Sequence, residues 1–251
     1  MIPKIIHYCW FGGNPLPKLA KKCIKSWKKF CHDYQIIEWN ESNYDISSAP
    51  LYVRQAYAAK KWAFVTDYVR LQVVYENGGI YLDTDVEIIK PIDDLLKYDA
   101  YFGFESKYIN TGLGFGAVKN NELLHSIMQD YYNIVFIKDD NTYDTLPCPQ
   151  RNSHILKEYG FNLDGTTQII KNTAVFSSEY FCPRAWNNTK IVLTKNTYTI
   201  HHFTASWRTK KDKKIEKKQI KKIKQHRRIK MIIIKLFGEK RYNKLKEFIK
   251  K

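Results

Sequence analysis

Residues 63–86 read AFVTDYVRLQVVYENGGIYLDTDV, a helical apolar pattern, a double glycine and a short strand pattern that ends in Asp83 and Asp85. Side chains alternate along a strand, so the two carboxylates would share a face if the strand continued through both. Adjacent carboxylates repel each other unless a cation lies between them or one keeps its proton. The pattern favours a site for a hard cation such as Mn²⁺ or Mg²⁺ beside a substrate phosphate. The alternative interpretation is a pair of turn residues that follow the glycines.

The size and charge of the chain limit the domain organisation that it can have. It has 251 residues, 44% of them hydrophobic and 15% aromatic, which is typical of a globular protein. Residues 1–207 contain 22 basic and 21 acidic residues, whereas residues 208–251 contain 20 and 4, so 16 of the 17 net positive charges lie in the tail. No base-reading motif accompanies these lysines, and no nucleic-acid partner is expected. We predict a globular domain at 1–207 and a basic helical tail at 208–251.

The cysteines and the apolar segments indicate the cellular compartment. The five cysteines are widely spaced and form no CxxC pair, which argues against a zinc or redox centre and favours buried thiols in a reducing compartment. The first residues, MIPKIIHYCWFGG, are typical of a strand rather than a signal peptide. No segment approaches the roughly 20 apolar residues that span a bilayer. We therefore expect a cytoplasmic protein.

Hydrophobic periodicity predicts an α/β domain with a mixed sheet. A strand, a glycine turn, a helix and a second strand open the chain, as in nucleotide-binding α/β units. The expected helices are 17–30, 51–59, 63–76 and 122–135. The expected strands are 2–11, 34–39, 80–82, 86–89, 101–105 and 113–118, with further short strands between 166 and 200. Residues 138–152 are polar, contain two prolines and are predicted to form an exposed loop at an acceptor site.

Two further segments supply candidate site residues. Asp67 and Arg70 are three apart in a mostly apolar helix, where a charged pair needs a reason beyond a surface ion pair. In TYTIHHFTASW, residues 197–207, the two histidines His201 and His202 would point to opposite faces of a strand, so at most one is expected to reach a metal. Trp10, at the end of the first strand, could stack on a nucleobase or belong to the core.

Together these segments resemble a known family. IIHYCWFGG at 5–13, the 63–86 block and HHFTASW at 201–207 are similar to the DXD-containing sugar-binding glycosyltransferases of family 32. That family includes fungal Golgi mannosyltransferases and bacterial capsular-polysaccharide transferases, and its core is similar to the glucosylating domain of large clostridial toxins. The resemblance spans residues 1 to about 207. Its most specific part, S/T-D-x-x-R followed by G-G-x-Y-x-D-x-D, is present as Thr66, Asp67, Arg70, Gly78, Gly79, Tyr81, Asp83 and Asp85.

The resemblance implies a GT-A fold, a Rossmann-like nucleotide-diphospho-sugar transferase fold. It also implies a nucleotide-sugar donor and a divalent metal, usually manganese, with magnesium as the alternative. Asp85 would bind this metal directly, and Asp83 would be shared between the metal shell and the donor. His202 is the first choice for a further ligand and His201 the second.

The resemblance also assigns residues to the donor. Asp67 and Arg70, preceded by Thr66, would hold the donor sugar. Trp10 would stack on the base and Tyr81 would line the nucleoside pocket. Three further donor contacts are expected from Asn110, Ser206 and Trp207.

The activity implied is a metal-dependent, retaining transfer of a hexose from a nucleotide sugar, UDP being favoured. The acceptor would be a hydroxyl of a bacterial surface glycan precursor, such as a lipid-linked oligosaccharide for capsule, O-antigen or lipooligosaccharide. One alternative is a toxin-like protein glycosyltransferase, which lacks support because no delivery domain or secretion signal is evident. Another is a catalytically inactive membrane or nucleic-acid adaptor, against which the intact Asp83 and Asp85 pair argues.

The tail, 208–251, has an irregular stripe of isoleucines and leucines among its lysines. This composition is typical of an interfacial helix on an anionic leaflet, where each basic group contributes on the order of 1 kcal/mol. We expect a peripheral protein on the inner face of the cytoplasmic membrane. A solvated tail is the alternative.

Overall fold

The computed structural model describes residues 1–184, 190–204, 221, 225, 228, 231–235 and 238. Contacts divide the chain into a unit Met1–Thr204 and a unit Ala205–Lys251. The described residues of the second unit are helical, and the rest of the predicted tail helix lies outside the described residues. No helix among the described residues is long and apolar enough to cross a bilayer. The boundary predicted at residue 207 stays a prediction.

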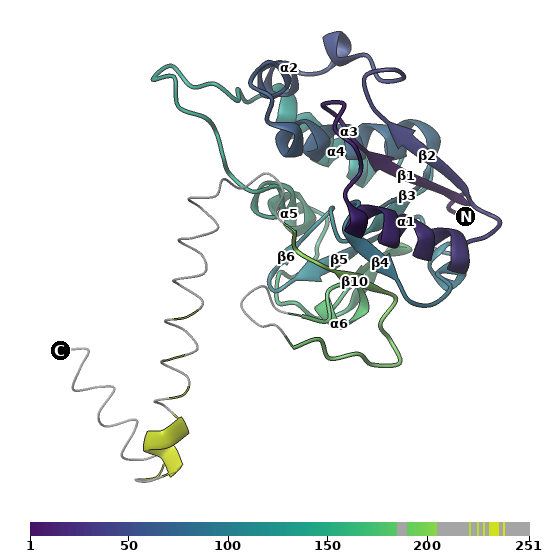
Figure 1. The fold of residues 1–251 in the computed structure, drawn as a ribbon, viewed down its shortest axis with the longest axis vertical. Coiled ribbons are helices and arrows are strands. Elements are labelled where there is room, and N and C mark those ends of the chain that lie inside the picture. The colour runs from purple at the N-terminus through teal and green to yellow at the C-terminus, as the bar shows by residue number, and fades with distance from the viewer. Residues whose placement is uncertain are drawn as a thin grey trace. The chain divides into compact units, whose positions relative to one another are not determined.

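A mixed sheet forms the centre of the unit Met1–Thr204 (Figure 1). From edge to edge its strands are β2 (Gln35–Trp39), β1 (Ile5–Cys9), β3 (Gly79–Tyr81), β7 (Phe115–Ala117), β5 (Ala100–Glu105), β9 (Thr173–Phe176) and β8 (Gln168–Ile170), and β6 (Tyr108–Ile109) pairs with β5. β1 is parallel to β2 and β3, and β5 is parallel to β9. β7 is antiparallel to both β3 and β5, and β8 is antiparallel to β9. The prediction of a mixed α/β sheet is confirmed.

Each face of the sheet carries its own hydrophobic core. The first core includes residues of α2 (Leu51–Ala58), α3 (Trp62–Asn77), α4 (Glu122–Gln129) and α5 (Cys148–Glu158). The second includes residues of α1 (Lys18–Phe30), β4 (Val86–Ile88) and α6 (Ser178–Phe181), and β10 (Thr199–His201) pairs antiparallel with β4. Adjacent strand residues alternate between the two cores, Ile80 in one and Tyr81 in the other. Short 3₁₀ turns occur at Ile46–Ser48, Asp93–Leu95 and Asp130–Tyr132.

The double glycine permits a sharp passage from α3 into β3. Gly78 and Gly79 have φ angles of 67° and 108°, a left-handed region that residues with a Cβ rarely adopt. A Cβ on Gly79 would lie 2.8 Å from the Ile5 carbonyl oxygen and 2.9 Å from His7 Nε2. Only glycine therefore lets β3 lie this close to β1, and this contact places the end of β3 at the centre of the sheet.

The segment 138–152 departs from the loop predicted for it, because its last part begins a helix. α5 starts at Cys148, with Pro147 as its N-cap and Pro149 in its first turn. Proline is tolerated there because the first-turn N–H groups have no intrahelical partner. The two prolines favour a loop in the sequence pattern, whereas in the structure they mark the start of a helix. The helix predicted at 122–135 also ends earlier, at Gln129.

Candidate active site

The DXD segment lies in a turn. β3 ends at Tyr81 and β4 begins at Val86, whose N–H donates to the Asp83 carbonyl oxygen at 2.9 Å. The strand does not continue through Asp83 and Asp85. The prediction that the two carboxylates share one face of a strand is therefore wrong. The turn nevertheless brings both carboxylates to the end of β3, at the centre of the sheet.

Asp83, Asp85 and His201 form a cluster of metal-ligand type. One ligand atom from each residue lies within 4.8 Å of the others, and such a set could hold a metal ion. Antiparallel pairing places His201 opposite Val86, so the imidazole arrives from a strand more than 100 residues later. His201 Nε2 lies 3.3 Å from one oxygen of Asp85, and Thr204 donates its N–H and hydroxyl to the other, each at 2.8 Å. Asp85 is thus held in place from two sides.

His202, the first choice from sequence, is directed elsewhere. Its Nε2 lies 2.9 Å from Glu87 Oε2, and the same oxygen pairs with Lys22 Nζ at 2.9 Å. Only its backbone N–H reaches the DXD turn, where it donates to the Asp85 carbonyl oxygen at 3.0 Å. The structure therefore places His201, the second choice, beside the carboxylates, because alternate residues of a strand point to opposite faces. Which histidine binds a metal stays a prediction.

The Asp85 and His201 pair is ionised at neutral pH. Burial raises the pKa of Asp85, but the His201 imidazolium and the Thr204 hydrogen bonds outweigh it and hold the pKa well below its usual range. Burial lowers the pKa of His201, but Asp85 outweighs it and raises the pKa to about 10. A metal ion that uses His201 as a ligand would have to displace the proton that makes this imidazole an imidazolium.

Asp83 joins the cluster to a buried cation. Arg70 Nη2 lies 3.2 Å from Asp67 Oδ1 and 3.4 Å from Asp83 Oδ1. Arg70 Nε donates to the Thr66 carbonyl oxygen at 2.9 Å, and the guanidinium lies 5.1 Å from the centre of the Tyr81 ring. The Tyr81 hydroxyl donates to Asp83 Oδ1 at 3.0 Å. The side chain of Asp83 is 28% exposed and that of Arg70 only 5%, so Asp83 is the more accessible of the two from solvent.

The loop after β6 encloses Asp83 from the other side. Asn110 Oδ1 accepts the Gly112 N–H at 2.7 Å, and the Gly112 carbonyl oxygen accepts the Asp83 N–H at 3.4 Å. A Cβ on Gly112 would lie 2.3 Å from Asp83 Oδ2 and 3.0 Å from Arg70 Nη1. Gly112 is thus a site residue that the sequence reasoning missed, because its constraint is a contact with groups distant in the chain.

Cys148 is a second missed residue. Its Sγ lies 4.0 Å from Arg70 Nη1 and 3.9 Å from Thr111 Oγ1, and burial raises the pKa of its thiol well above the usual value. The cysteine occupies the first residue of α5, in the segment predicted to be a loop. The signal that could have placed it in a helix is the pair of flanking prolines.

Of the remaining predicted donor residues, the structure describes only Trp10. Trp10 is partly buried after the end of β1, where its Nε1 donates to the Asn14 carbonyl oxygen. Ser206 and Trp207 lie outside the described residues.

The comparisons with known proteins agree with this geometry. Residues 17–102 match the model of the glycosyltransferase sugar-binding region containing a DXD motif. Inositol phosphoceramide mannosyltransferase 3 of Schizosaccharomyces pombe is 32% identical over 103 residues, which are 40% of this chain and 29% of the relative. The uncharacterized glycosyltransferase L373 of Acanthamoeba polyphaga mimivirus is 24% identical over 226 residues, 82% of this chain and 84% of the relative. The chain thus spans less than a third of the first relative and most of the second.

The fold comparison gives the same class. The solved structure of the PaToxG glycosyltransferase superposes with a TM-score of 0.50 at 19% identity, covering 63% of this chain and 69% of that one. This likeness concerns the fold, and it confirms the predicted GT-A architecture. The predicted resemblance to DXD-containing glycosyltransferases is confirmed as well, and the predicted enzyme class agrees with the family model and both relatives.

Proposed function

We propose that this chain, which carries the DXD sugar-binding region at residues 17–102, transfers a hexose from a nucleotide sugar to a glycan hydroxyl. The observation that carries the proposal is the convergence of Asp83, Asp85 and His201 beside the Arg70 and Asp67 pair. Two carboxylates, an imidazole and an adjacent guanidinium suit a divalent cation, a diphosphate and sugar hydroxyls in one place. If Asp67 and Arg70 formed only a surface ion pair, and Asp83 and Asp85 only a turn, these side chains would not need to lie in one place.

The proposed metal residues fit a hard cation. Asp85 is ionised, and its second oxygen is fixed by Thr204, so one oxygen faces His201 in a defined orientation. Asp83 is the more exposed carboxylate and would be shared with the donor. A divalent cation held by these side chains, Mn²⁺ first and Mg²⁺ second, would supply charge neutralisation for the departing nucleoside diphosphate.

The chain's own residues would bind and orient the donor. Arg70 keeps Asp83 oriented through its ion pair, and its positive charge adds to the field at the diphosphate. Asp67, whose Oδ1 pairs with Arg70, keeps carboxylate lone pairs for hydrogen bonds from sugar hydroxyls. The Tyr81 ring against Arg70 would close the nucleoside side.

Five further donor contacts are proposals, and so is the stereochemistry of the transfer. Thr66, Asn110, Ser206 and Trp207 would add hydrogen-bond donors and acceptors to the sugar and diphosphate, and Trp10 would stack on the base. No carboxylate is proposed as a nucleophile, because Asp83 and Asp85 are assigned to the metal and Asp67 to the arginine. Attack by the acceptor hydroxyl on the face that the diphosphate leaves, with retention of configuration, is the working mechanism.

The acceptor is proposed to be a lipid-linked glycan precursor for a bacterial surface polysaccharide. The name of the fungal relative places a sugar on inositol phosphoceramide, which supports a lipid-carried acceptor and adds mannose to the donors worth testing. The protein would then act as a peripheral enzyme on the inner face of the cytoplasmic membrane, with residues 208–251 against anionic lipid.

The test is nucleoside diphosphate release from a panel of UDP- and GDP-hexoses, with Mn²⁺, Mg²⁺ or EDTA. We expect release from one donor that depends on the metal and falls at least about 100-fold in Asp85→Asn, the scale of losing one electrostatic group at a reaction centre. Asp94→Asn, which removes an exposed carboxylate elsewhere, is the matched control and should keep full activity. Undiminished release by Asp85→Asn, or release unaffected by EDTA, would contradict the proposal.

A further inference from the structure

Helix α1 carries an uncommon concentration of positive charge. Its 13 residues, KLAKKCIKSWKKF, include six lysines and no acidic residue. All six are exposed: Lys18, Lys21, Lys22, Lys25, Lys28 and Lys29. Because residues 1–207 as a whole contain nearly equal numbers of basic and acidic residues, this helix concentrates positive charge in one place.

The lysines form one continuous stripe along the helix. At 3.6 residues per turn and a rise of 1.5 Å per residue, their positions fall within an arc of about 120°, and the stripe is about 17 Å long. The buried residues Ala20, Cys23 and Trp27 occupy the opposite side. The helix therefore presents one face to the core and a wholly cationic face to solvent, here called the lysine stripe.

The lysine stripe is fixed on the body of the protein. Trp27 Nε1 donates to the Val86 carbonyl oxygen at 2.7 Å, and Ser26 Oγ accepts the Ile88 N–H at 3.0 Å. β4, to which these bonds anchor α1, begins directly after Asp85. A surface that binds the stripe would consequently hold the candidate active site in a defined orientation.

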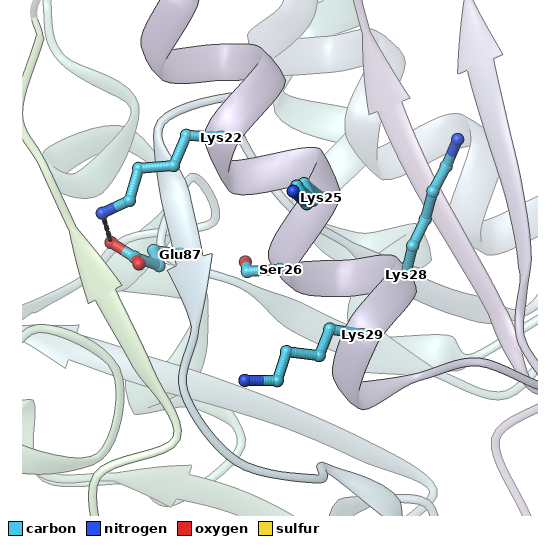
Figure 2. A pocket seen from close by; sticks show the side chains of 6 residues that line it. All are labelled: Lys22, Lys25, Ser26, Lys28, Lys29 and Glu87. Carbon is cyan, nitrogen blue, oxygen red and sulfur yellow. Dashed lines mark hydrogen bonds and ion pairs between the residues drawn. The ribbon is translucent and has the colours of Figure 1, made fainter.

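Among the residues that the structure describes, most of these lysines have no carboxylate partner. Lys22 pairs with Glu87 at 2.9 Å. Across residues 1–184 and 190–204, no carboxylate lies within ion-pair distance of the other five lysines. Figure 2 shows Lys25, Lys28 and Lys29 projecting from α1 around a hollow that Lys22 and Glu87 border. Like charges this close repel each other, and an external anionic surface would relieve the repulsion.

We propose that the lysine stripe docks the protein on an anionic membrane surface. A cluster of four to eight basic residues on an amphipathic helix is the usual pattern for anionic headgroups. Nucleic-acid sites combine their basic residues with arginine, amide or aromatic side chains that contact bases, and the exposed face of α1 has none of these. The lysine stripe belongs to a different segment of the sequence from the tail 208–251, and its docking does not depend on sugar transfer.

The docking is electrostatic and lacks insertion into the lipid. The apolar side of α1 is occupied by the protein core, so no apolar face is left to enter the acyl region. Binding through the stripe should therefore weaken strongly as salt is added, because exposed charges are screened over about 10 Å at 0.1 M ionic strength.

The experiment compares two full-length variants with the same change in net charge. In one, Lys18, Lys21, Lys25 and Lys28 are replaced by glutamine. In the other, four exposed lysines elsewhere are replaced: Lys107, Lys119, Lys138 and Lys157. Binding to phosphatidylcholine vesicles with and without phosphatidylglycerol is measured at low and high salt, together with circular dichroism and donor hydrolysis.

We expect the stripe variant to bind phosphatidylglycerol vesicles at least about tenfold more weakly at low salt and the control variant to bind nearly as the wild type does. Donor hydrolysis should be unchanged in both, which separates failure of docking from failure of the proposed activity. Equal weakening in both variants would overturn the proposal, since net charge alone would then act. Unchanged vesicle binding in the stripe variant would overturn it too. So would an affinity for duplex DNA or RNA, measured in the same buffers, that only the stripe variant loses.

If the quadruple variant is poorly folded, two double variants replace it, Lys18 and Lys21 in one and Lys25 and Lys28 in the other. Each should lose part of the vesicle affinity, and an absence of loss in both would equally contradict the docking.

Discussion

Replacing Arg70 by methionine tests whether the buried cation holds the site together. Methionine keeps much of the side-chain volume but leaves Asp67 and Asp83, now 3.2 Å and 3.4 Å from Nη2, without their counter-charge. Removing one partner of a buried ion pair typically costs about 3–5 kcal/mol, because the other charge stays buried and unpaired. Asp67 is only 12% exposed whereas Asp83 is 28% exposed, so water compensates Asp83 in part. We therefore expect the free energy of unfolding to fall by about 3 kcal/mol at pH 7, which is the lower end of that range.

The pH dependence of this loss follows from the carboxylates. Burial already raises the pKa of Asp67 and of Asp83, and Arg70 is the largest of the groups that oppose it. Without the arginine both pKa values should rise further. A carboxyl whose folded pKa lies above its unfolded value destabilises the protein at high pH and does so less as pH falls. The difference in unfolding free energy between wild type and Arg70→Met should accordingly shrink between pH 7 and pH 5.

Urea denaturation in EDTA at pH 7 and pH 5 measures both quantities. Arg54→Met is the matched control, since Arg54 is an exposed arginine of α2 and should change stability by less than about 0.5 kcal/mol. A double variant, Arg70→Met with Asp67→Asn, should regain part of the loss because one buried charge is removed with its partner. The reasoning would be refuted if Arg70→Met lowered the free energy of unfolding at pH 7 no more than Arg54→Met does. It would also be refuted if the difference in unfolding free energy between wild type and Arg70→Met grew as pH falls.

Three further outcomes are expected. Gly112→Ala should lower donor hydrolysis by at least about tenfold in a steady-state assay, because its Cβ would lie 2.3 Å from an oxygen of Asp83 and must displace it. In EDTA, the His201 and Asp85 pair stabilises the folded state fully between about pH 4 and pH 6.5, and this stabilisation should be lost as pH rises to about 10; His201→Gln should lack that slope in urea titrations. Burial lowers the pKa of His7, so wild-type stability should also fall as pH drops below 6.5, and the slope should be absent in His7→Asn.

Sequence reasoning placed most elements of the fold correctly where local signals agree. The helix of residues 63–76 and the double glycine after it were predicted within a few residues of the observed α3, because apolar periodicity and a glycine stop act locally. The mixed sheet also followed from strand patterns. The start of α5 was missed, since prolines at 147 and 149 suit both a loop and a first helical turn, and only packing of the helix distinguishes them.

The sequence by itself determined which chemical groups this protein carries: two carboxylates one residue apart, a charged pair in an apolar helix, and a histidine pair near residue 200. Tertiary structure alone decided which of them meet. The register between β4 and β10 brings His201 to Asp85 and leaves His202 with Glu87. This register is set by pairing between strands more than 100 residues apart, and no local sequence pattern encodes it. Long-range contacts likewise turned Gly112 and Cys148 into site residues, because close packing constrains residues by their neighbours in space.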